Sequence, residues 1–244
     1  MKILIDIGHP AHVHLLRNMY HQLIQNGHVV CVTVKDIPIA KVLLEKYNIK
    51  YINIGKKRDS LLGKAITQLY YNYKILKFVI KNKIEIGIGT SITLTHISKL
   101  TKMKSILLDD DDDDVQPLFV KYAHPFANTI LSPSSLTQNR KSKKTIFYSG
   151  FHELAYLHPK RFTPNIEVLN EIGLKKGDPF FIIRFNVFKA HHDVGVLGMS
   201  LEQKLKLVSV LKPHGKIFIT TERNIEPELK RVCLKVSLFF SVFS

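Results

Sequence analysis

Cysteine is scarce in this sequence, and long apolar runs are missing from it. The 244 residues include two cysteines, Cys31 and Cys233, which are too few for a disulfide framework and favour a reducing compartment. No run approaches the roughly 20 apolar residues needed to cross a bilayer. The opening Met1-Lys2 leads into a short run with an aspartate, which lacks the apolar core of a signal peptide. We therefore expect a soluble, cytoplasmic protein.

Acidic residues are outnumbered as well. Lys and Arg total 36 against 20 Asp and Glu, and the net charge of +16 favours anionic partners such as nucleotides, phospholipid surfaces or nucleic acids. Nucleic acid is the least favoured of these, because the sequence lacks helix-turn-helix spacing, zinc-finger spacing and an aromatic-rich strand platform. The basic residues are dispersed, apart from the segment 140–144 and a lysine flank described below.

Short apolar runs alternate with amphipathic segments along most of the chain. Ile3–Ile7 is followed by glycine, by a helical pattern from about Leu15 to Asn26, and by a second apolar run, Val29–Val34. Continuous apolar runs suit strands covered on both faces, and their alternation with helices predicts an α/β fold with a doubly wound, Rossmann-like parallel sheet. We expect this N-terminal domain to span residues 1–152. A linker and an incomplete second Rossmann-like domain are expected over residues 153–244.

The junction between the first strand and the first helix holds three histidines within six residues. Ligands of parallel α/β sheets bind outside the carboxyl ends of the strands, where this junction must lie. The backbone N–H groups at the start of a helix also favour anions. Solvated turn histidines are the alternative interpretation. The candidate site residues here are Gly8, His9, His12 and His14.

Two later strand ends carry further polar groups. Thr90 and Ser91 follow Gly89 in a small-residue turn, and the strand Ser105–Leu108 leads into six consecutive aspartates, residues 109–114. Their place at a strand end makes Asp109 and Asp110 candidates for a base or for a partner that orients a histidine. The later aspartates fit a solvated, self-repelling loop. Carboxylates without His or Cys at ligand spacing do not predict a dedicated metal site, and we expect no cofactor.

The segment from Ser60 to Ile84 contains no acidic residue. Its apolar residues recur at steps of three and four, which predicts a helix with one core-facing stripe and a lysine flank. An ordinary surface helix and a cationic face that docks on an anionic membrane are both consistent with this pattern. The predicted stripe is Leu62, Ile66, Leu69, Tyr73, Leu76 and Ile80, and the flank is Lys74, Lys77 and Lys81.

A second β-α-β unit begins at the buried-strand pattern Phe180–Phe185. The segment that follows it is dense in polar side chains, and a further strand, Lys216–Thr220, ends close to an acidic residue. The candidate ligand-binding residues of this unit are Arg184, Asn186, His191, His192, Asp193 and Glu222.

Four stretches of the sequence resemble the domain-of-unknown-function 354 family: 3–14, 150–159, 161–164 and 184–193. That family is grouped with the two-domain GT-B glycosyltransferases and the non-hydrolysing UDP-N-acetylglucosamine 2-epimerases. The resemblance runs from Met1 to about Lys230 and implies an acceptor side on the N-terminal domain and a sugar-nucleotide donor side on the C-terminal one. By position, Arg184, His191, His192 and Asp193 would meet the donor diphosphate.

The end of the chain departs from the family. Members continue through further β-α units with a phosphate-binding turn, whereas this sequence ends in a Phe- and Ser-rich tail after Lys230. We expect a truncated protein, with an exposed sheet edge that favours aggregation and with activity impaired or lost.

Three functions are consistent with the sequence. The first is a nucleotide-sugar-dependent glycosyltransferase of surface polysaccharide or glycolipid assembly, acting on a saccharide or lipid-linked acceptor. In that reaction His9 or His12, with Asp109 or Asp110, would supply a general base, and Arg184 would neutralise the leaving diphosphate. The second is a sugar-nucleotide epimerase that uses the same acid and base. The third is a non-enzymatic protein that binds an anionic ligand or a membrane surface, with Lys74, Lys77 and Lys81 as contacts.

Overall fold

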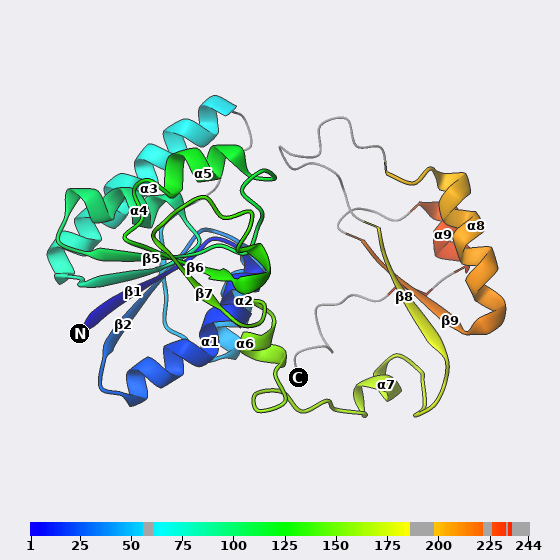
Figure 1. Cartoon of the computed structure of the whole chain (residues 1–244). Helices are drawn as coiled ribbons and strands as arrows, with labels where there is room; N and C mark the ends of the chain where they lie inside the picture. Colours follow the sequence, from blue (N-terminus) through cyan, green and yellow to red (C-terminus); the bar gives the residue numbers. More distant parts are fainter. Residues whose placement is uncertain (56–60, 186–197, 222–225, 233, 236–244) are drawn as a thin grey trace. The chain divides into compact units, whose positions relative to one another are not determined.

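The computed structural model of the chain describes all residues except 56–60, 186–197, 222–225, 233 and 236–244 (Figure 1). It divides into two compact units, Met1–Phe162 and Thr163–Ser244. The first unit thus runs beyond residue 152, where the sequence placed its end. The one-turn helix α6 (Leu154–Leu157) belongs to it, because Asn18 Nδ2 on α1 (Pro10–Gln25) donates to the Ala155 carbonyl oxygen at 2.8 Å.

The first unit is built on a seven-stranded sheet with the order β3-β2-β1-β4-β5-β6-β7, and every strand pairs in parallel with its neighbours. Ile5 of β1, an interior strand, lies opposite Val32 on one side and Ile88 on the other. The doubly wound parallel sheet is therefore confirmed. Its strands are β1 (Lys2–Ile7), β2 (Val29–Val34), β3 (Ile52–Asn53), β4 (Ile86–Gly89), β5 (Lys104–Leu108), β6 (Thr129–Pro133) and β7 (Thr145–Tyr148).

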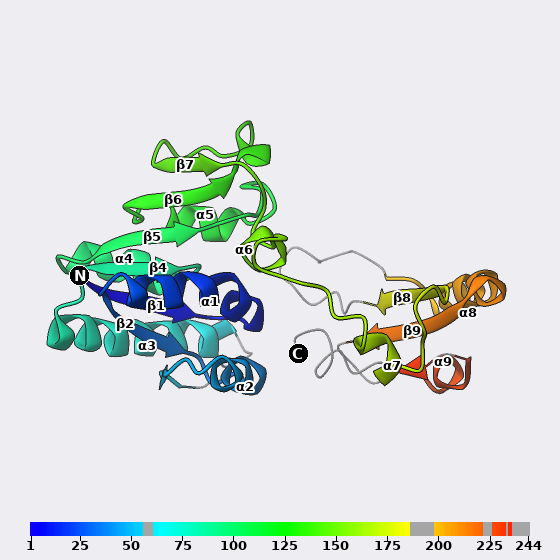
Figure 2. The same cartoon turned by 90° about the horizontal axis from the view of Figure 1, so that it is seen from below.

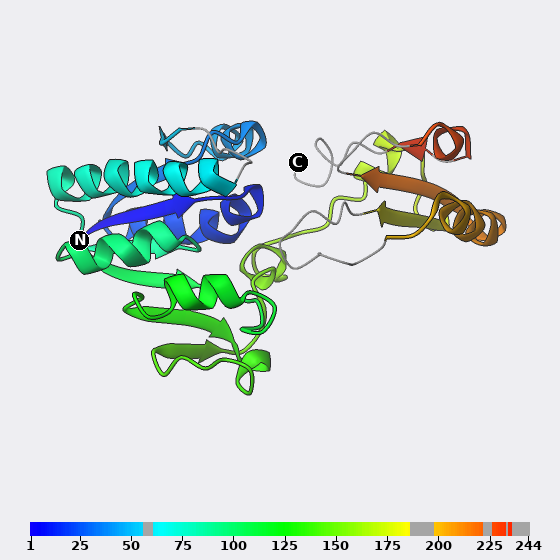
Figure 3. The same cartoon turned by 90° about the horizontal axis from the view of Figure 1, so that it is seen from above.

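Helices cover both faces of this sheet. Figure 2 shows the face with α1, α2 (Pro38–Lys46) and α6, and Figure 3 shows the opposite layer with α3 (Leu61–Asn82), α4 (Ile92–Leu100) and α5 (Pro117–Ala123). Alternation along β1 divides its side chains between the layers. Ile5 joins the cluster under α1 and α2, whereas Leu4 packs with Ile75 of α3 and Leu94 of α4. A short 3₁₀ turn, η1 (Ser134–Leu136), follows β6.

Helix α1 begins at Pro10, earlier than the apolar periodicity from Leu15 predicts. His9 is its N-cap, and the His9 Nδ1 accepts a hydrogen bond from the Ala11 amide at 3.2 Å. Proline suits the first helical position because its missing N–H has no intrahelical partner there. Consequently His12 and His14 project from the first turns of a helix and not from a loop.

The buried face of α3 differs from the predicted one. Thr67, Tyr71, Ile75 and Val79, spaced four residues apart, are buried against α4 and the sheet, whereas most of the predicted stripe is exposed. The prediction of a core-facing stripe is therefore wrong for Ile66, Leu69, Tyr73 and Ile80. The helix has two apolar stripes, and periodicity alone does not distinguish which one meets the sheet.

The second unit contains a parallel three-stranded sheet of order β10-β9-β8 in its described part. Helix α8 starts with a capping box formed by Ser200 and Gln203, and Val208 of that helix packs with Phe185 and Ile219 of the sheet. Its elements are α7 (Val168–Glu171), β8 (Phe180–Phe185), α8 (Leu201–Leu211), η3 (Lys212–His214), β9 (Lys216–Thr221), α9 (Pro227–Val232) and β10 (Leu234–Lys235). No helix within the described ranges of either unit combines the length and apolar character needed to cross a membrane.

Candidate functional site

The candidate site lies at the carboxyl edge of the first sheet, where β1, β4 and β5 end side by side. The ends of β1 and β4 approach closely, since a Cβ built on Gly89 would lie only 2.7 Å from the Asp6 carbonyl oxygen. Only glycine tolerates that approach. The first residues of α1 and α4 are thereby brought together at one corner of the edge.

His12 occupies this corner between the two strand ends. Its Nδ1 accepts from the Gly8 amide at 3.3 Å, and Thr90 Oγ1 lies 3.1 Å from the same nitrogen. Burial, followed by His9 and Lys35, lowers the pKa of His12 to about 4, while Asp110 opposes the shift. His12 is therefore a neutral imidazole at pH 7, able to donate one hydrogen bond and accept another.

Asp110 and His152 form a pair beside this imidazole. Asp110 Oδ2 lies 2.9 Å from His152 Nδ1, and this hydrogen bond lowers the pKa of Asp110, which stays ionised at neutral pH. The other ring nitrogen, His152 Nε2, is buried and has no hydrogen-bond partner among the described residues. A carboxylate at Nδ1 fixes the proton of a neutral ring on that nitrogen and leaves the Nε2 lone pair available as a base.

Tyr148 stacks on His152, with ring centroids 6.1 Å apart and planes 8° from parallel. Burial, together with the charges of Asp110 and Glu153, raises the pKa of Tyr148 to about 12. Its phenol thus remains protonated, and within the part of the chain that the structure describes its buried hydroxyl lacks a hydrogen-bond partner. Stacking on Tyr148 orients the imidazole ring of His152. The protonated phenol does not compete with that ring for a proton.

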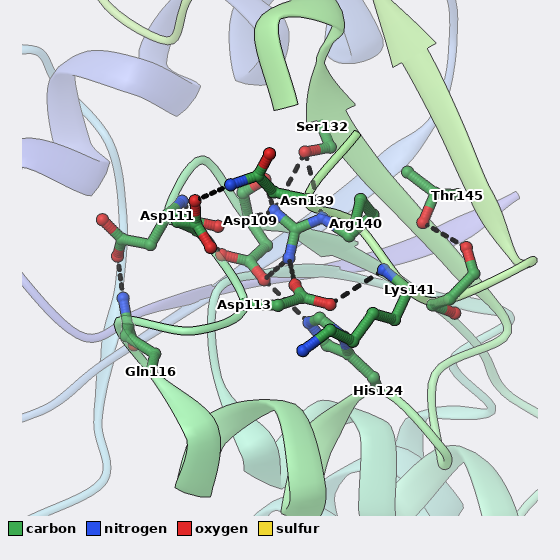
Figure 4. A network of polar contacts seen from close by, with 12 residues as sticks. Asp109, Asp111, Asp113, Gln116, His124, Ser132, Asn139, Arg140, Lys141 and Thr145 are labelled. Carbon is green, nitrogen blue, oxygen red and sulfur yellow. Dashed lines mark hydrogen bonds and ion pairs between the residues drawn. The ribbon is translucent and has the colours of Figure 1, made fainter. Parts of the chain in front are cut away.

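Asp109, the neighbour of Asp110, belongs to a different network (Figure 4). Its Oδ2 lies 2.7 Å from Arg140 Nη1 and 2.7 Å from His124 Nε2. Arg140 also binds Asp113 and donates to Ser132 Oγ, and its side chain has no exposed surface. The expectation of a solvated loop is therefore wrong for Asp113, which is buried against this guanidinium.

Arg140 also fixes the backbone around Asp110. Its Nη2 donates to the carbonyl oxygens of Asp109 at 3.1 Å and Asp111 at 2.8 Å, the residues on either side of Asp110. Among the described residues, ligand atoms of Asp109, Asp113 and His124 lie within 4.8 Å of one another. The Arg140 guanidinium already supplies their positive charge, so this cluster is assigned to the structure of the loop.

Two predicted site residues have structural partners. Ser91 caps α4 and its hydroxyl donates to buried Asp6 Oδ2 at 2.6 Å, an aspartate that also accepts from Thr33. His14 is buried between α1 and α2, with Nδ1 3.1 Å from the Tyr47 hydroxyl, and burial lowers its pKa to about 4. His14 therefore does not join His12 at the corner.

In the second unit, Arg184 is exposed within strand β8, in register with Thr220. The other predicted ligand residues of that unit, Asn186, His191, His192, Asp193 and Glu222, lie outside the described residues. Their roles stay predictions.

The sequence did not single out His152, Tyr148, Lys35 or Arg140 for this site. Asp110 and His152 are brought together by the return of the chain through β6 and β7, which no local spacing records. The lysine after β2 and the histidine after β7 do share one signal, because both closely follow a strand of the same sheet. Polar residues at every carboxyl strand end are the wider set to consider.

A family model described as "Protein of unknown function (DUF354)" matches residues 1–194. The chain belongs to this DUF354 family. No curated protein sequence gives a significant match to this DUF354 protein.

Solved structures similar to the DUF354 protein are UDP-GlcNAc 2-epimerases and glycosyltransferases. The epimerase from Neisseria meningitidis bound to UDP-GlcNAc gives a TM-score of 0.64 at 10% identity over 97% of this chain and 72% of its own. The Methanocaldococcus jannaschii epimerase gives 0.64 at 14% identity over 95% and 67%. Acinetobacter baumannii MurG gives 0.50 at 12% identity over 95% and 61%. The fold is therefore the Rossmann-like architecture of GT-B proteins, and the chain spans between 61% and 72% of these three neighbours.

Proposed function

We propose that this DUF354 protein is a nucleotide-sugar-dependent glycosyltransferase that works in the cytoplasm on a saccharide or lipid-linked acceptor of surface polysaccharide or glycolipid assembly. The observation that carries the proposal is the Asp110–His152 pair next to the neutral His12, because the buried His152 Nε2 has no partner in the described ranges. A carboxylate-oriented imidazole is the arrangement that general-base catalysis on a hydroxyl requires.

In the proposed reaction an acceptor hydroxyl attacks the anomeric carbon of the donor sugar, whose bond to the nucleotide diphosphate breaks. His152 Nε2 takes the hydroxyl proton, and Asp110 stabilises the imidazolium that forms. His12 and the amides at the start of α1 donate hydrogen bonds to oxygens of the reacting sugar. Arg184, with His191 and His192, is proposed to neutralise the departing diphosphate. His9 caps α1 and Asp109 is held by Arg140, so neither carries the proton in this scheme.

A titration of the 244-residue chain with UDP-, GDP-, CMP- and dTDP-sugars tests the donor. A ligand that binds the native state stabilises it by about 2.7 kcal/mol when its concentration is one hundred times Kd. The melting temperature therefore rises as the ligand concentration increases. We expect one nucleotide class to produce this rise. Transfer is then followed as nucleotide diphosphate release that depends on added acceptor. Binding without release in any acceptor extract would contradict the enzymatic part of the proposal.

Epimerisation is the second candidate, because solved structures that share this fold include UDP-GlcNAc 2-epimerases. The imidazole would then remove the C2 proton while the C1–O bond to UDP breaks, and a proton would return to the opposite face of C2 as UDP adds back to C1. Incubation with UDP-GlcNAc in heavy water distinguishes the reactions, because epimerisation exchanges the C2 hydrogen for deuterium without acceptor. Glycosyl transfer leaves that hydrogen in place.

A further inference from the structure

The outer face of α3 is an unusual surface for a helix of this length. Four of its exposed apolar side chains are Ile66 (52%), Leu69 (70%), Tyr73 (61%) and Ile80 (62%). Tyr70 (48%) is exposed as well, and Lys74 Nζ lies 4.5 Å from the centroid of its ring. With 3.6 residues per turn these four fall on one side of the exposed arc. Lys77 and Lys81 are exposed on the other side of the arc, together with half-buried Lys74. We name the four apolar residues and the three lysines the α3 face.

Nothing in the core accounts for this pattern. The inward face of α3 is formed by Tyr71, Ile75 and Val79, which are almost completely buried against α4 and the sheet. Replacing the α3-face residues with polar ones would therefore leave the interior packing intact. An exposed apolar stripe of this kind typically marks an interaction surface.

The chain segment that forms α3 and its neighbours carries mostly positive charge. From Ser60 to Leu108, the segment that forms α3, β4, α4 and β5, the sequence has eight lysines and a single acidic residue, Glu85. Figure 3 shows α3 and α4 side by side in this layer. A protein partner with a mixed surface would meet repulsion from the lysines, whereas an anionic surface would not.

The stripe also continues past the end of α3. Ile80 lines a hollow of 590 Å³ between the C-terminal ends of α3 and α4, together with Lys83, Lys102 and the exposed Leu100. Glu85 also lines it, and its Oε1 accepts from the Lys2 amide at 2.8 Å. A surface of apolar side chains and neighbouring lysines therefore extends from α3 to α4.

We propose that the α3 face docks on a membrane surface that contains anionic phospholipids. Leu69, Tyr73 and Ile80 enter the boundary between headgroups and acyl chains, while Lys74, Lys77 and Lys81 contact the phosphates. The arrangement is that of a helix lying in the plane of the interface, held by buried apolar area and by charge. The inference is independent of the reaction proposed above, because no sugar nucleotide takes part in docking.

Vesicle sedimentation with the full chain tests this proposal. The protein should sediment with phosphatidylcholine vesicles that contain phosphatidylglycerol, and much less with pure phosphatidylcholine. Two variants address the face: Lys74→Gln with Lys77→Gln and Lys81→Gln, and Leu69→Ser with Tyr73→Ser and Ile80→Ser. The lysine variant should lower the partition coefficient on the order of tenfold or more at low salt, with a smaller loss at high salt.

Matched controls separate the face from the overall charge of the chain. Lys143, Lys160 and Lys206 are exposed elsewhere, and their replacement by Gln removes the same charge. Val42, Ile146 and Val210 have exposed fractions of 62%, 58% and 59%, and their replacement by Ser matches the apolar variant. Both controls should sediment as the unmodified protein does.

Three results would overturn the proposal: no sedimentation with anionic vesicles, an equal loss in face and control variants, or a dimer in solution that the apolar variant dissociates. The last result would mean that a second copy of the chain covers the α3 face. Circular dichroism of each variant checks that the helices are retained. Sedimentation is measured without any sugar nucleotide, so a negative result leaves the proposed reaction standing.

Discussion

Asp109 and Asp110 are adjacent in the chain and directly follow β5. The polar groups around Asp110 are less completely paired than those around Asp109. On the Asp109 side, Arg140, His124, Asp113 and Ser132 form a buried network in which one carboxylate oxygen meets two donors (Figure 4). On the Asp110 side, one carboxylate meets one imidazole, and the described residues offer no hydrogen-bond partner to the Nε2 of that ring or to the Tyr148 hydroxyl.

Buried polar groups are normally paired, because an unpaired one loses its hydration without compensation. On the Asp109 side, His124 Nδ1 is also without a partner among the described residues, but Asp109 and Asp113 are both paired with Arg140, and this network shapes the loop. The Asp110 side departs from it at two atoms, as expected of a site that completes its hydrogen bonds with a ligand. The comparison therefore assigns stability to one aspartate and chemistry to the other.

Removing the guanidinium should have the largest effect. Arg140→Met leaves the buried carboxylates of Asp109 and Asp113 without their cation, and breaking a buried ion pair costs about 3–5 kcal/mol. Urea unfolding of the full chain measures this loss as a lower midpoint. Arg140→Lys, which keeps the charge but loses the planar set of donors, should fall between the variant and the unmodified protein. A loss below about 1 kcal/mol would show that the network does not hold the loop.

Neutralising Asp110 should act mainly on turnover. Asp110→Asn removes the charge that orients His152 and stabilises its protonated form, so the proposed transfer should slow by about 100-fold, or ~2.7 kcal/mol of barrier. Asp114→Asn is the matched control, since Asp114 is exposed and pairs only with Lys141 among the contacts described.

A second readout needs no substrate. The ¹⁵N shifts of the His152 ring report which nitrogen carries the proton, and Asp110→Asn should shift them, whereas Asp114→Asn should not. If Asp110→Asn left both the ring shifts and the turnover unchanged, the Asp110–His152 pair would not be the base.

The sequence alone did not predict the contrast between the two aspartates, but it did predict the sheet that carries them. The apolar runs of β1, β2 and β5 fixed the sheet, since a run without polar alternation is buried on both faces. The pairing of Asp110 with His152 and of Asp109 with Arg140 depends on how the chain returns through β6 and β7, and local periodicity carries no record of it.

The buried face of α3 is a second feature that the sequence alone did not determine. The stripe through Leu69 and Tyr73 and the stripe through Tyr71 and Ile75 both have helical spacing, and hydrophobicity alone favours neither as the core face. The deciding contacts come from α4 and the sheet, where Gln68 Nε2 donates to Thr93 Oγ1 at 2.8 Å.

The neutral imidazole at the corner should make stability depend on pH. The pKa of His12 is about 4 in the folded protein against 6.5 for an ordinary histidine, so the unfolded chain binds a proton that the folded one does not. Stability is therefore fully present above pH 6.5 and is lost as the pH falls from 6.5 towards 4. Between pH 7 and pH 5 this amounts to about 2 kcal/mol.

Urea unfolding at a series of pH values measures this slope, and His12→Gln should flatten it. His14, whose pKa is also about 4, acts over the same window, so the double variant with His14→Gln should flatten the slope about twice as much. The slope separates titration from packing, because a lost contact lowers stability equally at every pH. An unchanged slope in His12→Gln would mean that the pKa of His12 is the same in the folded and unfolded protein, and that the pKa of the buried ring is not lowered.

The smallest effect is expected at the residue beside Arg140. Lys141 Nζ lies 2.6 Å from Asp114 Oδ1, but the two side chains are 69% and 76% exposed, so water and salt screen their attraction. Lys141→Met should lower the urea midpoint much less than Arg140→Met does, and added salt should remove most of that difference. Arg140 and Lys141 both pair with aspartates of one tract, so burial is the variable that separates them. A loss as large as that of Arg140→Met would show that the charge of the tract as a whole, and not the buried guanidinium, holds the loop in place.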